Sequence, residues 1–302
     1  MIADSFFEQG STHEVCEDYA VHGLEYAILS DGCSNGGGPR IDSDWGSRLL
    51  CKAAEQHLSR FVASPDDPSA FLAAVSGTAQ TQVRTFPNLG VNCLTATLLL
   101  LTHRTYTSLD ALVIGDGIVG GKRHDGRWKI YMIEFVGGGP YYLKYQMCGE
   151  EEQWKEHCGS TCRVSTFFGK LLPEYEPPED FTFENRTDFW QQNGSWGERT
   201  FEWDFRQPYM LFDFSREEYE FVFISSDGLQ SFYQPRREGV RKYNEPVHVL
   251  DVVRILMDIR TSKPGFARLQ RNWSFKQDRA GTFRRLNWLN GDDVSIGAIH
   301  CE

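Results

Sequence analysis

The segment Phe221-Val-Phe-Ile-Ser-Ser-Asp227-Gly228 is an apolar run that ends in a carboxylate followed by a glycine. Four apolar residues bounded by a turn signal predict a buried β-strand, and the glycine lets the chain turn sharply after it. The same design recurs at Tyr26-Ala-Ile-Leu-Ser-Asp31-Gly32 and, as a variant, at Leu112-Val-Ile-Gly-Asp116-Gly117. The sequence therefore predicts three buried strands that each hold an aspartate at one end.

Two acidic pairs lie at similar boundaries, Glu17-Asp18 and Asp292-Asp293, each just before a predicted strand. If these five places converge, the carboxylates repel one another, and several would have to be protonated unless cations neutralise them. A set of oxygen ligands with few histidines or thiols fits Mg²⁺ or Mn²⁺ and disfavours zinc and copper. Two such ions can activate a water and clamp the phosphoryl group that it attacks.

An isolated Asp-Gly pair is weak evidence, because this dipeptide is common in ordinary turns. Asp125-Gly126 is interpreted as such a turn, and Glu17-Asp18 alone would read as a solvated pair. The combination of these acidic segments favours a metal site, because apolar strands precede three of the carboxylates.

The remainder of the chain predicts an α+β protein. The strands between residues 93 and 135 have no helices between them, which favours antiparallel meanders. The predicted segments are helices at 44–62, 68–85, 247–260 and 266–279, and strands at 26–30, 93–102, 108–115, 128–135, 220–226 and 294–300.

Residues 137–215 differ in character from the rest. They are acidic and aromatic, with Trp190, Trp196 and Trp203 close together and no clean periodicity. We interpret this stretch as a divergent insertion in a single domain that spans 1–302, and the tryptophans as a small satellite core.

Composition excludes several classes of protein. The 302 residues carry a net charge of −11, whereas a general nucleic-acid binder needs a basic face. No apolar run reaches the length of a membrane helix, and the N-terminus lacks a signal-peptide pattern. The eight cysteines are scattered, which favours free thiols in a reducing compartment. We expect a cytoplasmic monomer with no nucleic-acid or membrane partner.

Taken in order, these segments resemble the metal-dependent protein phosphatases of the PP2C (PPM) family, and the first motif resembles its bacterial branch in particular. The similar segments are Gln9–Asp18 with His13 and the acidic pair, Ser30-Asp31-Gly32 followed by Asn35-Gly-Gly-Gly38, Thr95-Ala-Thr97 with Ile114-Gly-Asp116, Ser225-Ser-Asp-Gly-Leu229, and Gly291-Asp-Asp-Val-Ser295.

The resemblance implies a four-layer α/β/β/α sandwich, with two antiparallel sheets packed together and helices outside. It implies two Mg²⁺ or Mn²⁺ ions, with a weaker third, at one end between the sheets. A water or hydroxide bridging two ions would attack a phosphoserine or phosphothreonine of a protein substrate, with no covalent intermediate. The chain would then be a protein-serine/threonine phosphatase.

The resemblance also assigns the metal ligands, and Asp31 would bridge both ions. The other ligands are the Gly32 carbonyl beside it, Glu17 or Asp18 on one ion, Asp227 and Asp292 on the other, and Asp116 at the third metal. Asp31 and Asp227 would be the carboxylates most directly tied to the activated water.

Three positions depart from the family pattern. The eukaryotic branch has a phosphate-binding arginine where this chain has His13, so either a protonated His13 or another residue such as Arg40 would bind phosphate. Asp293 replaces an asparagine and adds negative charge to the site. Gly117 stands where a serine is common, which weakens the match at the third metal.

Two alternatives stay open: an inactive PP2C-fold binding or scaffold module, and a hydrolase of the same fold acting on non-protein phosphate esters. A cysteine phosphatase is disfavoured because no cysteine has an arginine six positions on. His157, Cys158 and Cys162 could form half of a zinc site, but no second pair of suitable spacing follows.

Overall fold

The computed structural model describes residues 2–33, 43–137, 139–171, 183–238, 241–257 and 288–301. The glycine-rich segment at 35–38, Arg40 and the helix predicted at 266–279 lie outside the described residues. None of the described helices is long and apolar enough to cross a membrane.

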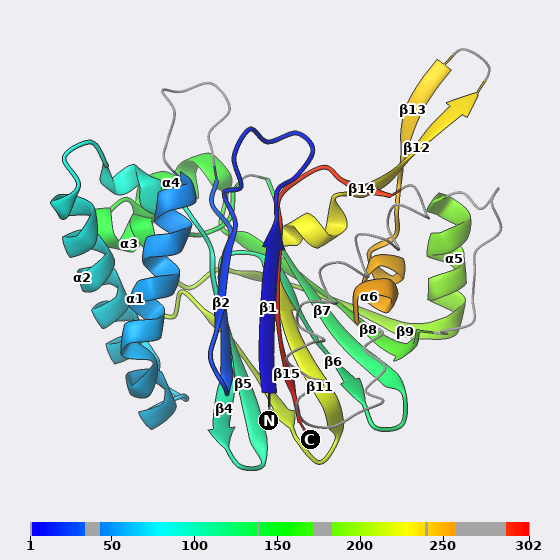
Figure 1. The fold of residues 1–302 in the computed structure, drawn as a ribbon, viewed down its shortest axis with the longest axis horizontal. Helices are drawn as coiled ribbons and strands as arrows, with labels where there is room; N and C mark the ends of the chain where they lie inside the picture. The colour runs from blue at the N-terminus through cyan, green and yellow to red at the C-terminus, as the bar shows by residue number, and fades with distance from the viewer. Residues whose placement is uncertain are drawn as a thin grey trace.

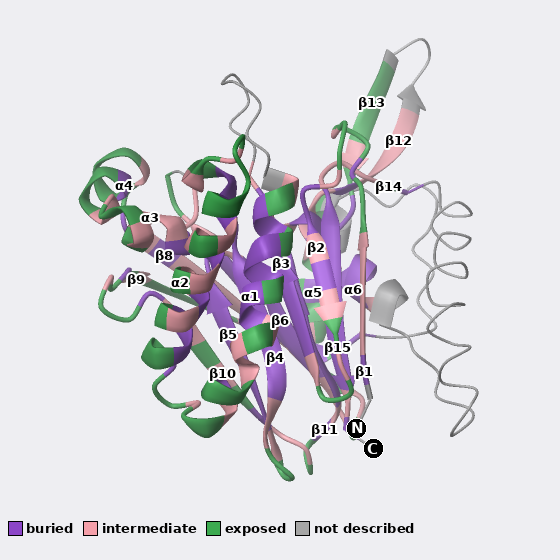
Figure 2. Ribbon diagram, turned by 60° about the vertical axis from the view of Figure 1, so that its left-hand side comes forward, coloured by how far each residue is buried: buried purple, intermediate pink, exposed green. Residues whose placement is uncertain are grey.

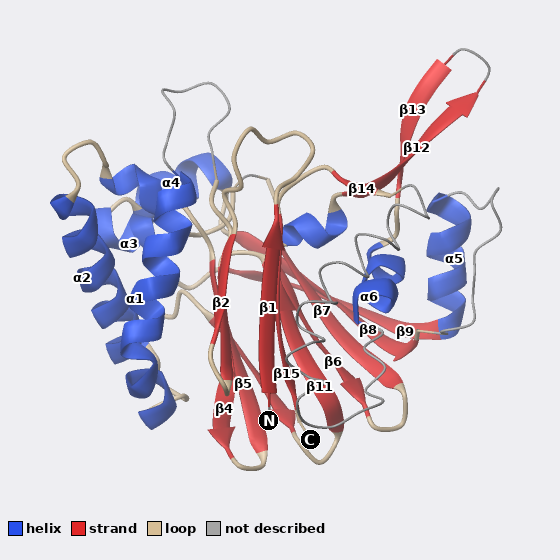
Figure 3. Cartoon of the chain, in the orientation of Figure 1, coloured by secondary structure: helices blue, strands red, loops and turns tan. Residues whose placement is uncertain are grey.

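Two antiparallel sheets and a smaller third one hold all the named strands (Figure 3). The seven-stranded sheet has the order β1 (Ile2–Glu8), β15 (Val294–His300), β11 (Tyr219–Ser225), β6 (Gly117–Arg123), β7 (Arg127–Phe135), β8 (Thr161–Lys170) and β9 (Gly194–Glu202). The five-stranded sheet has the order β10 (Met210–Ser215), β5 (Ser108–Ile114), β4 (Leu98–Thr105), β3 (Tyr26–Ser30) and β2 (Tyr19–His22). The third has β13 (Arg241–Pro246), β12 (Phe232–Glu238) and β14 (Leu289–Asn290). The predicted mixed α+β class with antiparallel sheets is confirmed.

The helices lie on two sides of these sheets (Figure 1). The long α1 contacts β2, β3 and β4 and packs against α2, while α5 contacts β9. The described helices are α1 (Ser43–Ala63), α2 (Ser69–Thr85), α3 (Leu143–Cys148), α4 (Glu151–Cys158), α5 (Phe183–Asn193) and α6 (Val249–Met257), with 3₁₀ turns η1 (Val91–Leu94) and η2 (Asp227–Gln230).

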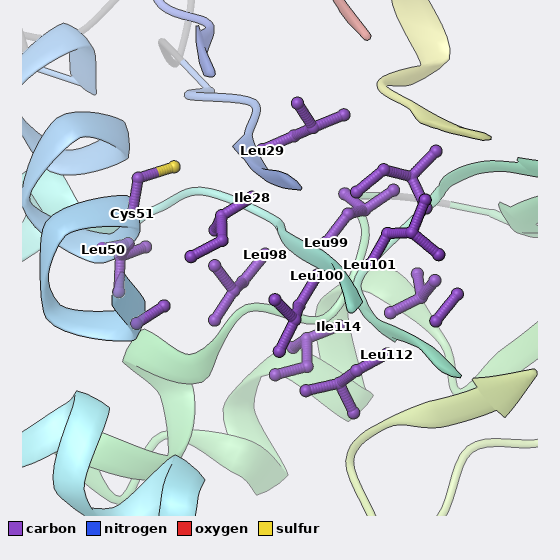
Figure 4. Close-up of a cluster of buried hydrophobic side chains, with 14 of the residues drawn as sticks. Ile28, Leu29, Leu50, Cys51, Leu98, Leu99, Leu100, Leu101, Leu112 and Ile114 are labelled. Atoms are coloured by element: carbon purple, nitrogen blue, oxygen red, sulfur yellow. The ribbon is translucent and has the colours of Figure 1, made fainter. Parts of the chain in front are cut away.

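The apolar run of β4 is buried on both faces, which explains why it lacks polar alternation. Cross-strand partners share a face of a sheet, so Ile28, Leu100 and Leu112 form one row through their pairings. This row lies toward Leu50 and Cys51 of α1 (Figure 4). Leu99, which lies between two members of this strand's α1-facing set, packs instead against Gly117 of the seven-stranded sheet.

A second buried cluster covers the seven-stranded sheet on the side of α6. It contains Leu250 and Val253 of the helix, together with Phe223, Ile130 and Ile296 of the strands. Burial is concentrated in the strands, whereas α1 and α2 turn exposed residues to solvent (Figure 2). The regular spacing of apolar residues along α1 and α2 thus reflects the one face that each helix packs against the protein.

One predicted strand needs correction. The strand predicted at 93–102 begins only at Leu98, because Cys93 and Leu94 belong to the 3₁₀ turn η1. These two residues are buried next to α1, so their apolar character reflects packing and not strand formation. Residues 137–215, whose sequence shows no clean periodicity, contribute β8 and β9 to one sheet and β10 to the other.

The tryptophans of this stretch do not form one satellite core. Trp190 is buried with Phe167 on the α5 side, and Trp196 packs against the same ring. Trp203 belongs to the other cluster, where it contacts Phe135. Trp190 and Trp196 therefore pack in one buried cluster and Trp203 in the other.

Asp110 is a buried carboxylate in the middle of β5, with an exposed fraction of 5%. Its direct partner on β10 is Asp213, and like charges directly opposite one another destabilise a sheet. Burial raises the pKa of Asp110 to about 6, and the charges of Asp213 and Asp66 add to the shift. The unfolded state titrates near 3.8, so the ionised carboxylate destabilises the fold above about pH 6.

Asp110→Asn is therefore expected to increase the free energy of unfolding at pH 7.5 by on the order of 1–3 kcal/mol. The gain should shrink as pH falls through 6 and disappear near pH 4, where the folded parent is already protonated. Urea unfolding at both pH values measures it, and Asp213→Asn, which removes only the opposing charge at the exposed partner position, should give a smaller gain. Equal gains at pH 7.5 and pH 4 would contradict the assignment.

Candidate metal centre

The chain around Asp31 is fixed by the segment Thr95-Ala96-Thr97. The Asp31 N–H donates to the Thr97 hydroxyl at 3.0 Å, and the Asp31 carbonyl accepts the Thr97 N–H at 2.9 Å. Gly32 forms a β-bridge with Ala96, and the Cys33 N–H donates to the Thr95 carbonyl at 2.9 Å. Two motifs that are far apart in sequence therefore hold one aspartate rigidly at the end of β3.

Five aspartates converge at the same end of the two sheets. Each comes from the end of a different strand: Asp18 before β2, Asp31 after β3, Asp116 between β5 and β6, Asp227 in η2 after β11, and Asp292 before β15. Asp18 is buried and the other four are half-buried, so solvent reaches the cluster.

The pKa values of these carboxyl groups show that they act on one another. Burial raises the pKa of Asp31 well above its usual range, and the charges of Asp18, Asp227 and Asp116 raise it further. Burial and the charge of Asp227 likewise raise the pKa of both Asp116 and Asp292. The cluster carries more negative charge than a protein interior tolerates without a counter-charge.

Asp18 gives the clearest test of whether a cation fits here. Both of its carboxylate oxygens are buried, and the side chains of Asp31, Ser226 and Ser295 interact with the carboxyl group. Burial nevertheless raises the pKa of Asp18 to about 7, and the charge of Asp293 contributes. A buried carboxylate beside other carboxylates offers the oxygen ligands that Mg²⁺ and Mn²⁺ prefer.

The carboxylates of the described residues are not spaced around a single point as the ligands of one bound metal would be. Within the described ranges, no group of three or more histidine, cysteine, aspartate or glutamate side chains already has the spacing of a metal site. The donor chemistry therefore fits divalent cations, while the distances between the carboxylates do not reproduce a coordination sphere.

Asp293 organises the loop that carries the first acidic pair. It is buried, and it accepts the Gly10 N–H at 2.6 Å and the Glu17 N–H at 2.5 Å. Its second oxygen also lies 3.0 Å from Nδ1 of His13. The sequence suggested that Asp293 adds repulsion to the site, but two backbone N–H groups donate to it and His13 lies beside it, and it ties residues 10–17 to the start of β15.

His13 lies between the two aspartates of the Asp292-Asp293 pair. Its Nε2 is 3.2 Å from an Asp292 oxygen, while Nδ1 faces Asp293. Burial lowers its pKa, but Asp293, Asp292 and Glu17 together outweigh burial, so the pKa is raised. The nearby carboxylates therefore favour the protonated imidazole over the neutral one, and the predicted phosphate binding by His13 stays a prediction.

Gly117 and Gly228 explain two features of the motifs. Gly117 has φ +136°, and a Cβ on it would lie 2.7 Å from the Ser225 carbonyl oxygen, so a serine does not fit here. A Cβ on Gly228 would lie 1.7 Å from the Asp293 carbonyl oxygen. The glycine after Asp227 therefore allows η2 to pack directly on the backbone of the Asp292-Asp293 pair.

The thiols do not form a second reactive centre. All eight cysteines are free, and Cys33 lies near the carboxylates. Burial raises the pKa of the Cys33 thiol, and the charges of Glu17, Asp116 and Asp227 raise it further. A thiol held in the protonated form is a poor nucleophile.

Comparison with known proteins agrees with the order of the motifs. The family model described as protein phosphatase 2C matches residues 10–257. No curated protein matches the chain. Among solved structures, a bacterial serine phosphatase is 13% identical, with 100% of this chain and 98% of the other covered and a TM-score of 0.47. The Mycobacterium tuberculosis serine/threonine phosphatase PstP/Ppp is 14% identical, with coverage of 98% and 96% and a TM-score of 0.41. The photosystem II phosphatase PBCP is 9% identical, with coverage of 99% and 97% and a TM-score of 0.44.

Proposed function

The chain belongs to the protein phosphatase 2C family, and from this premise we propose that it is a metal-dependent phosphatase of phosphoserine and phosphothreonine in proteins. The observation that carries the proposal is the convergence of five aspartates from five strand ends, where burial and mutual repulsion raise the pKa of Asp31, Asp116 and Asp292. We further propose that the whole chain is one domain with the α/β/β/α layering of the family.

The proposed ligands divide between two Mg²⁺ or Mn²⁺ ions, with a weaker third. They are Asp31 and the Gly32 carbonyl, Glu17 or Asp18, Asp227, Asp292, and Asp116 for the third ion. When bound, the ions supply Lewis acidity, which makes water acidic enough to act as a nucleophile near neutral pH and stabilises charge on the phosphoryl oxygens.

The protein's own residues hold this arrangement in place. Thr97 fixes the backbone of Asp31 through two hydrogen bonds, so its carboxylate cannot move away from its neighbours. Asp293 holds the 10–17 loop and keeps His13 beside Asp292. Such supports matter because misplaced ligands cost catalysis steeply.

Hydrolysis of an aryl phosphate is expected to require added Mn²⁺ or Mg²⁺, to stop with EDTA and to return when excess metal is restored. The reason is that a carboxylate site without a resident cation has no other electrophile to stabilise the transferred group. Turnover should be followed together with metal binding by calorimetry and with cleavage of phosphoserine peptides.

Each of the other possible results of these measurements supports a different interpretation of the protein. Turnover that persists in EDTA contradicts the mechanism. Metal binding without turnover identifies a scaffold module, and turnover of small esters without cleavage of phosphopeptides identifies a hydrolase of non-protein esters.

A further inference from the structure

The seven-stranded sheet extends beyond the five-stranded sheet at one side of the molecule. β10 is the last strand of the five-stranded sheet, and its Phe212 ring lies 4.7 Å from the Tyr131 ring of β7. In the seven-stranded sheet, β8 and β9 follow beyond β7. Among the described strands, none continues the five-stranded sheet over these two. The inner face of β8 and β9 is therefore left without a covering strand.

A groove of about 680 Å³ lies at this uncovered place, between β8 and β9 on one side and β10 on the other. Its floor includes Val164, Thr166 and Phe201, and its wall includes the consecutive residues 210–212 of β10. Side chains of consecutive strand residues point to opposite faces, so three of them border one groove only along the edge of the strand. Among the described strands, β10 pairs with β5 alone. Its outer edge thus presents backbone N–H and C=O groups to the groove.

The face of β7, β8 and β9 that forms the floor is basic and aromatic. Cross-strand partners share a face, and one such pair joins Val164 to Arg199. The three acidic residues of these strands, Glu134, Glu198 and Glu202, are all on the opposite face. This face therefore carries cations and no carboxylate. Its basic and aromatic residues are Arg127, Lys129, Lys170, Arg199, Tyr131, Phe135, Phe168 and Phe201.

Arg199 is the basic residue that lines the groove itself. Its guanidinium lies over the Phe201 ring, 5.8 Å from the centroid, and it makes no ion pair with a carboxylate of the described residues. Glu198 borders the groove at the strand edge, but it lies with Glu134 near Arg163 on the opposite face, where both raise the pKa of the arginine. A guanidinium held over an aromatic ring without a counter-charge is available to bind a carboxylate.

We propose that this groove binds an extended segment of a partner protein that carries a carboxylate two positions from a large apolar side chain. The segment would pair its backbone with the free edge of β10 and so extend the five-stranded sheet. Side chains of alternate residues would then point to the floor, about 7 Å apart. The rows of the floor have the same spacing, with Arg199 and Val164 in one row and Phe201 and Cys162 in the next. A carboxylate over Arg199 therefore places the next inward side chain over Phe201.

The charge of the chain distinguishes this occupant from two others. A second copy would bring a net charge of −11 of its own, and a long polyanion such as nucleic acid would be repelled by the same charge. A short segment with a single carboxylate meets the cations of this face instead. The binding does not require catalysis and is independent of the proposed function.

The test uses fluorescein-labelled peptides with the central sequence Ile-Thr-Glu-Thr-Ile, which has the required alternation in either chain direction. We expect the parent to bind this peptide at least about 5-fold more tightly than the same peptide with glutamine in place of glutamate, at low ionic strength. The advantage should disappear in high salt. A peptide of the same composition in the order Ile-Ile-Glu-Thr-Thr should also bind at least about 5-fold more weakly, because it lacks the alternation. Fluorescence anisotropy measures all these affinities.

Substitution of Arg199 separates binding in the groove from general electrostatic attraction. R199Q should reduce the preference for glutamate below about 2-fold, and R199E should prefer the peptide with lysine at the central position. Both changes are at an exposed position of an edge strand, so thermal unfolding should stay close to that of the parent. R84E changes an exposed arginine of α2 and is the charge-matched control, which should keep the preference of the parent.

Three results would overturn the proposal. The first is a parent without a preference for the alternating glutamate peptide, and the second is an R199E protein that retains this preference. The third is occupation of the groove by another partner. A dimer in sedimentation equilibrium that R199E dissociates would identify a second copy, and an oligothymidylate that binds the parent more tightly than the peptide does would identify a polyanion.

Discussion

Asp31→Asn is expected to lower kcat on an aryl phosphate at least about 100-fold at saturating Mn²⁺. Asp31 is the carboxylate whose pKa is raised by three others of the cluster, Asp18, Asp227 and Asp116, so its charge acts on three neighbours. Removing its charge would disturb every cation that the cluster holds. Asn is close in size, so the Thr97 hydrogen bonds to the Asp31 backbone should survive.

Three measurements separate this effect from misfolding. In metal-free buffer, Asp31→Asn should unfold at a urea concentration equal to or above that of the parent, because one repelling charge is gone. Calorimetry should show weaker Mn²⁺ binding. Asp125→Asn, in the exposed turn between β6 and β7, is the matched control and should keep full activity. A kcat near that of the parent would place the catalytic centre elsewhere.

Gly228→Ala is expected to destabilise the protein by at least about 3 kcal/mol and to abolish activity. The new Cβ would lie 1.7 Å from the Asp293 carbonyl oxygen and 3.3 Å from the Val294 Cα. Both are backbone atoms, so η2 and the start of β15 would have to separate. That movement would pull Asp227 away from Asp292.

Gly77→Ala is the matched control for this substitution. Gly77 lies inside α2, and a Cβ on it would meet no atom within 4 Å. Alanine should therefore stabilise the helix by about 0.5–1 kcal/mol. Urea unfolding of both variants measures the difference, and a Gly228→Ala protein as stable as the parent would show that the packing of η2 on β15 is not required.

The sequence predicted best where structure is decided locally. The run before Asp31 was predicted as a strand at 26–30, and the structure has the same bounds, because four of its five residues are buried. The α1 and α2 helices were predicted to within one residue at each end, since their apolar faces repeat regularly. The carboxylates at the strand ends were predicted because they lie directly beside such local apolar runs.

The sequence predicted least where distant parts of the chain decide the structure. β9 is an edge strand with mostly exposed residues, so no apolar alternation marks it. Asp293 accepts a hydrogen bond from Gly10, which is 283 positions away, and no local sequence pattern at either residue predicts this contact. The β12–β13 hairpin was missed because its strands are polar and carry no apolar alternation.

The position of β15 has a consequence for synthesis on the ribosome. β1 has β15 as its partner, and β15 lies between β1 and β11. At about 5–20 residues per second, β1 waits roughly 15–60 s for residues 294–300 to be translated. During that time the nascent chain has an unpaired strand near its start and lacks Asp292, so neither the edge of the sheet nor the carboxylate cluster can be completed. The carboxylate cluster is therefore expected to form only after residues 294–300 have been translated, and the nascent chain to depend until then on chaperones that shield β1.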